Sequence, residues 1–151
     1  MQTKYKDMFT PDFVARQERQ LEVSLPLVRL MYETGVRLLA GTDMGSSLLA
    51  PGYSLHEELA MLAEAGVPPL DVLRAATQSP AQMLGLDDRG TVQEGKLADL
   101  VLLDQSPLQN IRNRQSIRAV ICRGELLERP ALDALLRQGE TATQRALEGS
   151  L

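Results

Sequence analysis

The stretch "PLDVLRAATQSPAQMLGLDDRGTVQEGKLADLVLLD", residues 69–104, changes the spacing of its apolar side chains part of the way along. Its first half predicts two short helices, the second with Pro80 in its first turn and Gly85 at its end. Its second half predicts a short strand, a turn at residues 94–95, and a strand over residues 98–104. The stretch joins a helical part of the chain to a β-rich part, so the predicted fold class is α/β to α+β.

Upstream, "VRLLAG", residues 36–41, is a nearly continuous apolar run. Such a run is typical of a strand buried on both faces, as in parallel α/β sheets. Thr42 and Asp43 follow at once, so a carboxylate stands at the end of the predicted strand. From the residues alone, Asp43 either caps a turn or is a functional acid. The next helix is predicted over "SLHEELAMLAEAG", where Ser54 and Glu57 have the spacing of a capping box.

Two helical pieces are predicted before the apolar run. Thr10 can cap the first, and Pro11 suits its first position because the missing N–H costs nothing there. Pro26 predicts a break or kink, since proline removes a hydrogen bond from a helix interior. The second piece ends at Gly35, which suits the left-handed position just past a helix end.

The downstream part is predicted to be β-rich and then helical. A hairpin is expected to turn at residues 123–124, and a short helix is expected to start at Pro130, with a frayed end. We therefore expect three regions: residues 1–86 with helices and one strand, residues 87–128 with strands, and residues 129–151 as a helical tail.

Composition and charge exclude several classes of protein. With 44% hydrophobic and 24% charged residues, the chain has the composition of a soluble globular domain. Its net charge of −4 argues against nucleic acid or an anionic membrane as a partner, and Arg112, Arg114 and Arg118 are interpreted as a solvated loop. Cys122 is the single cysteine, and no signal peptide or membrane span is visible, which predicts a cytoplasmic protein.

The phrases "GVRLLAGTD", "HEEL" and "GKLADLVLLD", the last after "AAT-x-x-PA-x-x-LGL", resemble the C-terminal part of the amidohydrolase superfamily. The resemblance covers residues 25–127 and is closest to the imidazolonepropionase-like and Xaa-Pro dipeptidase-like branch. It implies the last strand and helices of a (β/α)₈ barrel, followed by the C-terminal strands of a small β-sandwich domain, both truncated here.

The resemblance also implies roles for particular residues. The acid at the position of Asp43 is a zinc ligand and a proton shuttle during hydrolysis of an amide or lactam. His56 is implied to lie on the substrate side of the site, although a surface role is an equally open interpretation. For Glu57 a capping role suffices, and residues 44–47 are interpreted as a flexible connection.

The family's metal site needs ligands that this sequence does not contain. They are a His-x-His pair, a carboxylated lysine or glutamate, and further histidines, whereas the chain has one histidine. A catalytic zinc takes about three protein ligands, and only Asp43, His56 and Cys122 are unusual candidates. We therefore expect that the chain alone binds no zinc, and that it self-associates or pairs with a missing N-terminal half, since an open sheet edge invites pairing.

Three functions remain open at this point. The first is an incomplete C-terminal portion of a metal-dependent amidohydrolase that hydrolyses a C–N bond in an amide, dipeptide or cyclic amide. The second is one half of a split enzyme in which Asp43 works in a composite site. The third is a non-catalytic, self-associating binding or scaffold module.

Overall fold

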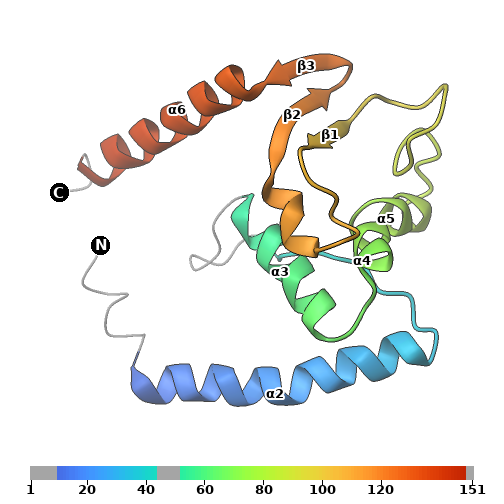
Figure 1. Cartoon of the computed structure of the whole chain (residues 1–151). Coiled ribbons are helices and arrows are strands. Elements are labelled where there is room, and N and C mark those ends of the chain that lie inside the picture. Colours follow the sequence, from blue (N-terminus) through green and yellow to red (C-terminus); the bar gives the residue numbers. More distant parts are fainter. Residues whose placement is uncertain (1–9, 44–51, 149–151) are drawn as a thin grey trace.

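The computed structural model describes residues 10–43 and 52–148 as helices around a small core, with a three-stranded sheet and a projecting terminal helix (Figure 1). No helix in these two ranges is long and apolar enough to cross a membrane. In chain order the elements are α2 (Pro11–Glu33), α3 (Tyr53–Glu64), α4 (Pro69–Ala76), α5 (Gln78–Met83), β1 (Leu100–Leu103), the 3₁₀ helix η1 (Ile111–Gln115), β2 (Ile117–Cys122), β3 (Glu125–Glu128) and α6 (Arg129–Glu148).

The long helix α2 begins as the sequence predicts but does not break. The Thr10 Oγ1 accepts a hydrogen bond from the Phe13 amide at 3.2 Å, and Pro11 occupies the first turn. The predicted break near Pro26 is wrong, because α2 runs through that residue to Glu33. Both Pro26 and Glu22 are exposed, so water can satisfy the Glu22 carbonyl that loses its intrahelical partner.

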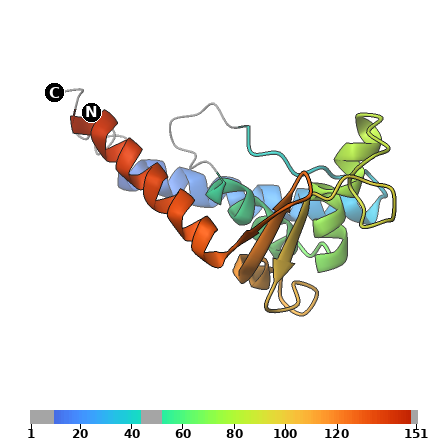
Figure 2. The ribbon, with the colours of Figure 1, turned by 90° about the horizontal axis from the view of Figure 1, so that it is seen from above.

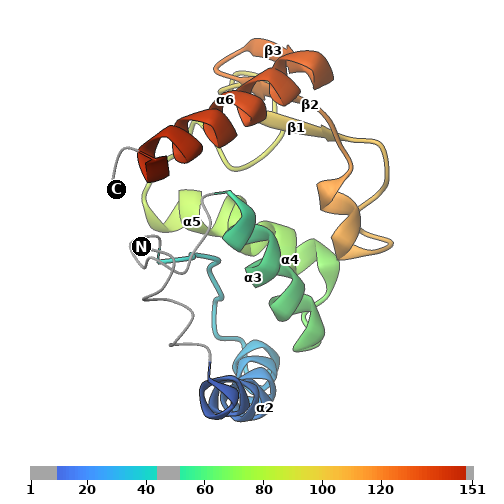
Figure 3. The same cartoon turned by 90° about the vertical axis from the view of Figure 1, so that its left-hand side faces the viewer.

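The core lies between α3, α4, η1 and the C-terminal half of α2. Its buried side chains are Leu59, Val67, Val72 and Ile111. The Tyr32 hydroxyl donates to the Asp71 Oδ2 at 2.7 Å and so ties α2 to α4. Figure 3 shows the resulting layers, with α2 seen end-on below α3, α4 and α5, and with the sheet and α6 above them.

The helix α3 does not start with the predicted capping box. It begins at Tyr53, and its N-cap is Gly52 with a positive φ (77°), which has no side chain to cap the helix. Ser54 therefore lies inside the first turn rather than at the cap. Gly52 is the N-cap residue because the chain enters this helix with a positive φ, which costs glycine less conformational energy than other residues.

Residues 36–41, predicted as a barrel strand, form no strand in this structure. The segment is irregular, and Leu38 and Ala40 pack against the core. Its backbone lacks a parallel neighbour in the described part of the chain, so no ladder of hydrogen bonds can form. The Ala40 amide instead donates to the Ala75 carbonyl at 2.9 Å, at the C-terminal end of α4.

The β-rich part forms one antiparallel sheet in the order β1-β2-β3. The hairpin predicted at residues 123–124 is confirmed: Arg123 and Gly124 both have positive φ, and Cys122 pairs with Glu125. The short strand predicted after Gly90 is absent. That stretch is a series of turns instead, closed by a 2.8 Å bond from the Leu97 amide to the Asp88 carbonyl.

The last helix, α6, is longer than the sequence predicts. It is one helix of 20 residues, where we expected a short helix with a frayed end. Figure 2 shows it extending away from the sheet, and Leu135 and Leu136 are exposed on it. The chain's accessible surface is 11470 Å². A compact chain of 16.6 kDa is expected to expose only about 7,600 Å², so this chain exposes much more surface than a compact one.

Candidate functional site

Asp43 ends the described segment that crosses the core toward α3. It is exposed and adopts a left-handed backbone conformation (φ 48°), which Asp tolerates better than most residues. The loop residues 44–47, interpreted above as a connection, lie outside the described residues. The acid predicted at the end of a strand is therefore at the end of an irregular segment in this structure.

That segment is held to α3 by a side chain the sequence analysis did not single out. The Glu58 Oε1 accepts a hydrogen bond from the Gly41 amide at 2.8 Å, two residues before Asp43. Glu58 is half-buried, whereas its neighbour Glu57 is exposed. A signal was available in the sequence: Glu58 lies three residues after Leu55 and four before Leu62, and residues at these spacings share one face of a helix.

His56 lies in the first turn of α3 and is half-buried. Its Nδ1 is buried and has no hydrogen-bond partner in the described part of the chain. Burial of the imidazole lowers the pKa of His56 below its usual 6.5, the charge of Arg114 lowers it further, and the Glu57 carboxylate opposes the shift. The helix that receives the Gly41 hydrogen bond thus also carries His56, although no hydrogen bond joins Asp43 to His56.

Arg114 corrects an interpretation made from the sequence. Its cluster was expected to be a solvated loop, but its side chain is only 5% exposed. Its Nη1 donates to the Ile111 carbonyl at 2.8 Å, and its Nη2 donates to the backbone carbonyl of His56. Residues three apart share one face of a 3₁₀ helix, so Ile111 and Arg114 are buried together. A signal was available in the sequence. Asn110 caps η1 by accepting a hydrogen bond from the Arg112 amide, and Arg114 follows the apolar Ile111 by three residues.

The shifted histidine gives a prediction that one titration can check. As the only histidine in the chain, His56 should give one imidazole signal by NMR, with a pKa below about 6.5 in the folded chain and near 6.5 in urea. Because the unfolded state then binds more protons, the free energy of unfolding should be highest above about pH 6.5 and should fall as the pH drops through the folded pKa. A folded-state pKa at or above 6.5 would contradict this environment.

The described residues do not by themselves fit a zinc site. In residues 10–43 and 52–148, no group of three or more His, Cys, Asp and Glu side chains is placed to hold a metal. Cys122 is exposed at the hairpin of the sheet. A zinc that takes about three protein ligands therefore needs donors beyond these side chains.

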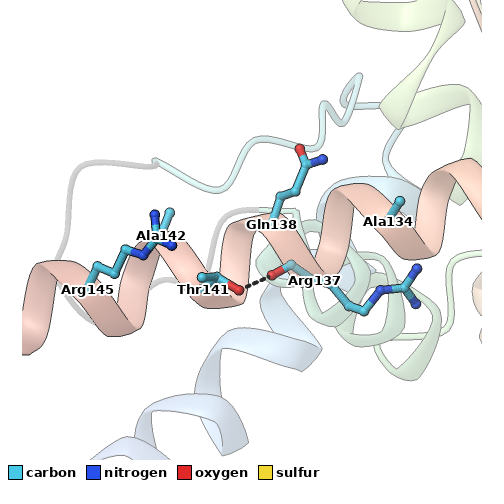
Figure 4. A pocket seen from close by; sticks show the side chains of 6 residues that line it. All are labelled: Ala134, Arg137, Gln138, Thr141, Ala142 and Arg145. Atoms are coloured by element: carbon cyan, nitrogen blue, oxygen red, sulfur yellow. Dashed lines mark hydrogen bonds between the residues drawn. The ribbon is translucent and has the colours of Figure 1, made fainter.

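A hollow of about 520 Å³ lies along α6, but it holds none of the candidate residues. Figure 4 shows the side chains on that helix, with the Thr141 hydroxyl bonded to the Arg137 carbonyl at 2.8 Å. The lining residues are Ala134, Arg137, Gln138, Thr141, Ala142 and Arg145. All come from one exposed helix, so this hollow supplies no converging groups for catalysis.

The described residues form a mixed fold of helices and one small antiparallel sheet. The profile of the amidohydrolase family matches residues 2–127. The chain therefore belongs to the amidohydrolase family.

The chain is also similar to individual proteins of known name, of which one relative and two solved structures are described next. An imidazolonepropionase of Pyrobaculum arsenaticum is 38% identical over 79 residues, which are 52% of this chain and 20% of that protein. The solved structure of a bottromycin amidohydrolase matches with a TM-score of 0.72 and 29% identity, covering 84% of this chain and 28% of that one. A Xaa-Pro dipeptidase structure with bound methionine in its active site matches with a TM-score of 0.62 and 30% identity, covering 69% and 25%.

These matches confirm the amidohydrolase resemblance and its imidazolonepropionase-like and dipeptidase-like branch. They also define how much of such a protein is present. The chain covers 32%, 13% and 20% of three curated relatives that it matches, so it spans about a third of their length or less.

Proposed function

We propose that the chain is the C-terminal portion of a metal-dependent amidohydrolase that hydrolyses a C–N bond in a small amide, dipeptide or cyclic amide. The match of residues 2–127 to the amidohydrolase family carries this proposal. In it, residues 36–41 would pair with strands of the missing portion and become the last strand of a (β/α)₈ barrel, and the sheet β1-β2-β3 would be the C-terminal part of a small β-sandwich.

The large exposed surface supports a chain that needs a partner to complete its fold. It exceeds the value expected for a compact chain of this mass by about half. Residues 36–41 belong to no strand in this structure, and in α2 the apolar side chains of Val23, Leu27 and Leu30 are more than half exposed. The proposed partner is the polypeptide that carries the remaining barrel strands, in the same or a separate chain, in the cytoplasm.

In the completed enzyme Asp43 is proposed as one carboxylate ligand of zinc, with the other ligands supplied by the partner polypeptide. When bound, zinc would polarise the carbonyl of the scissile bond. The Asp43 carboxylate would take up a proton as water attacks and return it to the leaving nitrogen. His56, kept neutral near pH 7 by its lowered pKa, would lie on the substrate side as a hydrogen-bonding group.

The experiment is an assay of hydrolysis by this chain, by the partner polypeptide, and by both together. Suitable substrates are dipeptides ending in proline, N-acyl amino acids and a cyclic amide, all with zinc added. We expect hydrolysis only when both polypeptides are present, because only their assembly holds all of the metal ligands. Hydrolysis by this chain alone would contradict the proposal. So would a folded, zinc-supplemented mixture that cleaves no C–N bond.

A further inference from the structure

We infer that Glu58 is a positioning residue for Asp43, and that Glu57 beside it is not. The inference rests on the proposed function for what Asp43 does, but its geometric part stands on the hydrogen bonds alone. Glu58 would act through the Gly41 amide and would touch neither the substrate nor the metal.

In the described part of the chain, the segment before Asp43 has no neighbouring strand, and its last two amides before Thr42 are bonded to helices instead. Ala40 is half-buried, so its N–H group requires a partner, whereas Gly41 is exposed and its N–H group could bond to water if Glu58 were absent. Here the Ala40 amide is bonded to the Ala75 carbonyl at 2.9 Å, and the Gly41 amide to the Glu58 Oε1 at 2.8 Å. Two consecutive amides are thus held by two different helices, α4 and α3.

These two bonds fix the backbone immediately before the acid. Only Thr42 lies between Gly41 and Asp43, and Asp43 itself has a left-handed conformation (φ 48°) that few residues adopt without support. The bond from Gly41 is charge-assisted when Glu58 is ionised, and such bonds are the stronger ones. Loss of the Glu58 carboxylate would release the segment from α3 and let the Asp43 side chain move.

The helix that holds the segment is itself anchored. Arg114 donates to the carbonyl of His56, two residues before Glu58 on α3, and also to the Ile111 carbonyl in η1. Leu59, next to Glu58, is buried in the core. Glu58 therefore projects from a fixed part of α3, which makes it a rigid support.

The first test measures the geometry in the chain alone. We expect Glu58→Ala to speed hydrogen exchange at the Gly41 amide by at least about tenfold, relative to core amides such as that of Val72. Glu58→Gln keeps a carbonyl acceptor and should retain most of the protection of the Gly41 amide. Glu57→Ala is the matched control and should leave hydrogen exchange at Gly41 unchanged. Unchanged Gly41 exchange in Glu58→Ala, or an unprotected Gly41 in the parent chain, would overturn the inference.

The second test measures positioning in the chain completed by its partner polypeptide. Glu58→Ala should lower kcat about 100-fold with little change in KM, because a displacement of about 1 Å suffices for such a loss. Glu58→Gln should recover most of it. An unchanged kcat together with lost Gly41 protection would make Glu58 merely structural. If the exchange results hold but the parent assembly hydrolyses nothing, the proposed function fails and the support of the Asp43 segment stands.

Discussion

Asp43→Asn is expected to lower kcat/KM of the completed enzyme by about 10³-fold, which is the size of effect typical of a lost acid–base group. Asparagine has nearly the same shape as aspartate, but it cannot carry a proton and it has no negative charge to offer a metal. Asp43 is exposed and makes no hydrogen bond to His56, so the fold should hardly change. The loss should therefore appear in turnover with unfolding unaffected.

The matched control for this variant is Asp87→Asn. Asp87 is also exposed, and it lies in a turn after α5, away from the segment that ends at Asp43. Steady-state kinetics of both variants should show normal turnover for Asp87→Asn. Equal activity in the parent and in Asp43→Asn would remove Asp43 from the chemistry.

Gly90→Ala is expected to reduce the free energy of unfolding by about 3 kcal/mol, by combining backbone strain with a steric clash. Gly90 has φ +89°, and a Cβ added there would lie 2.7 Å from the Ala81 Cβ and 3.0 Å from the Thr77 carbonyl oxygen. Ala81 is buried, and the Thr77 oxygen is a backbone atom, so neither can move cheaply. The close approach of this turn to α5 requires glycine.

Gly95→Ala is the control that separates backbone strain from the steric clash as causes of the stability lost in Gly90→Ala. Gly95 also has a positive φ, +84°, but nothing lies within 4 Å of an added Cβ. Gly95→Ala should lower the free energy of unfolding by about 1 kcal/mol, from the backbone conformation alone. Urea unfolding of the two variants beside the parent chain measures the difference, and equal losses would show that the contact with α5 is not tight.

The sequence predicts most helices and the hairpin because their signals are local. These signals act through the backbone preferences of a few neighbouring residues, as for Thr10 with Pro11, for Pro80, and for the turn at residues 123–124. The failures concern context. Residues 36–41 have the composition of a buried strand, but a strand requires a neighbour, which is not a property of its own residues. Pro26 should break a buried helix, yet α2 is exposed at that point.

The candidate site is also only partly predictable from the sequence. Asp43 and His56 remain predictions from a family resemblance, and the segments that carry them are joined by the hydrogen bond from Gly41 to Glu58. Glu58 and Arg114 were missed because their partners are backbone groups of distant residues. A hydrogen bond from a side chain to a backbone atom leaves no residue-type signal at the other end, so the arginine cluster looked like a solvated loop.

The most direct test of the central claim is the zinc content per chain of the assembly formed with the partner polypeptide, by elemental analysis of untagged protein. We expect about one zinc per assembly for the parent and for Asp87→Asn, a large loss in Asp43→Asn, and no stoichiometric zinc on this chain alone. Zinc retained at full level by Asp43→Asn would contradict a metal-binding role for Asp43, and stoichiometric zinc on this chain without its partner would contradict the need for the partner's ligands.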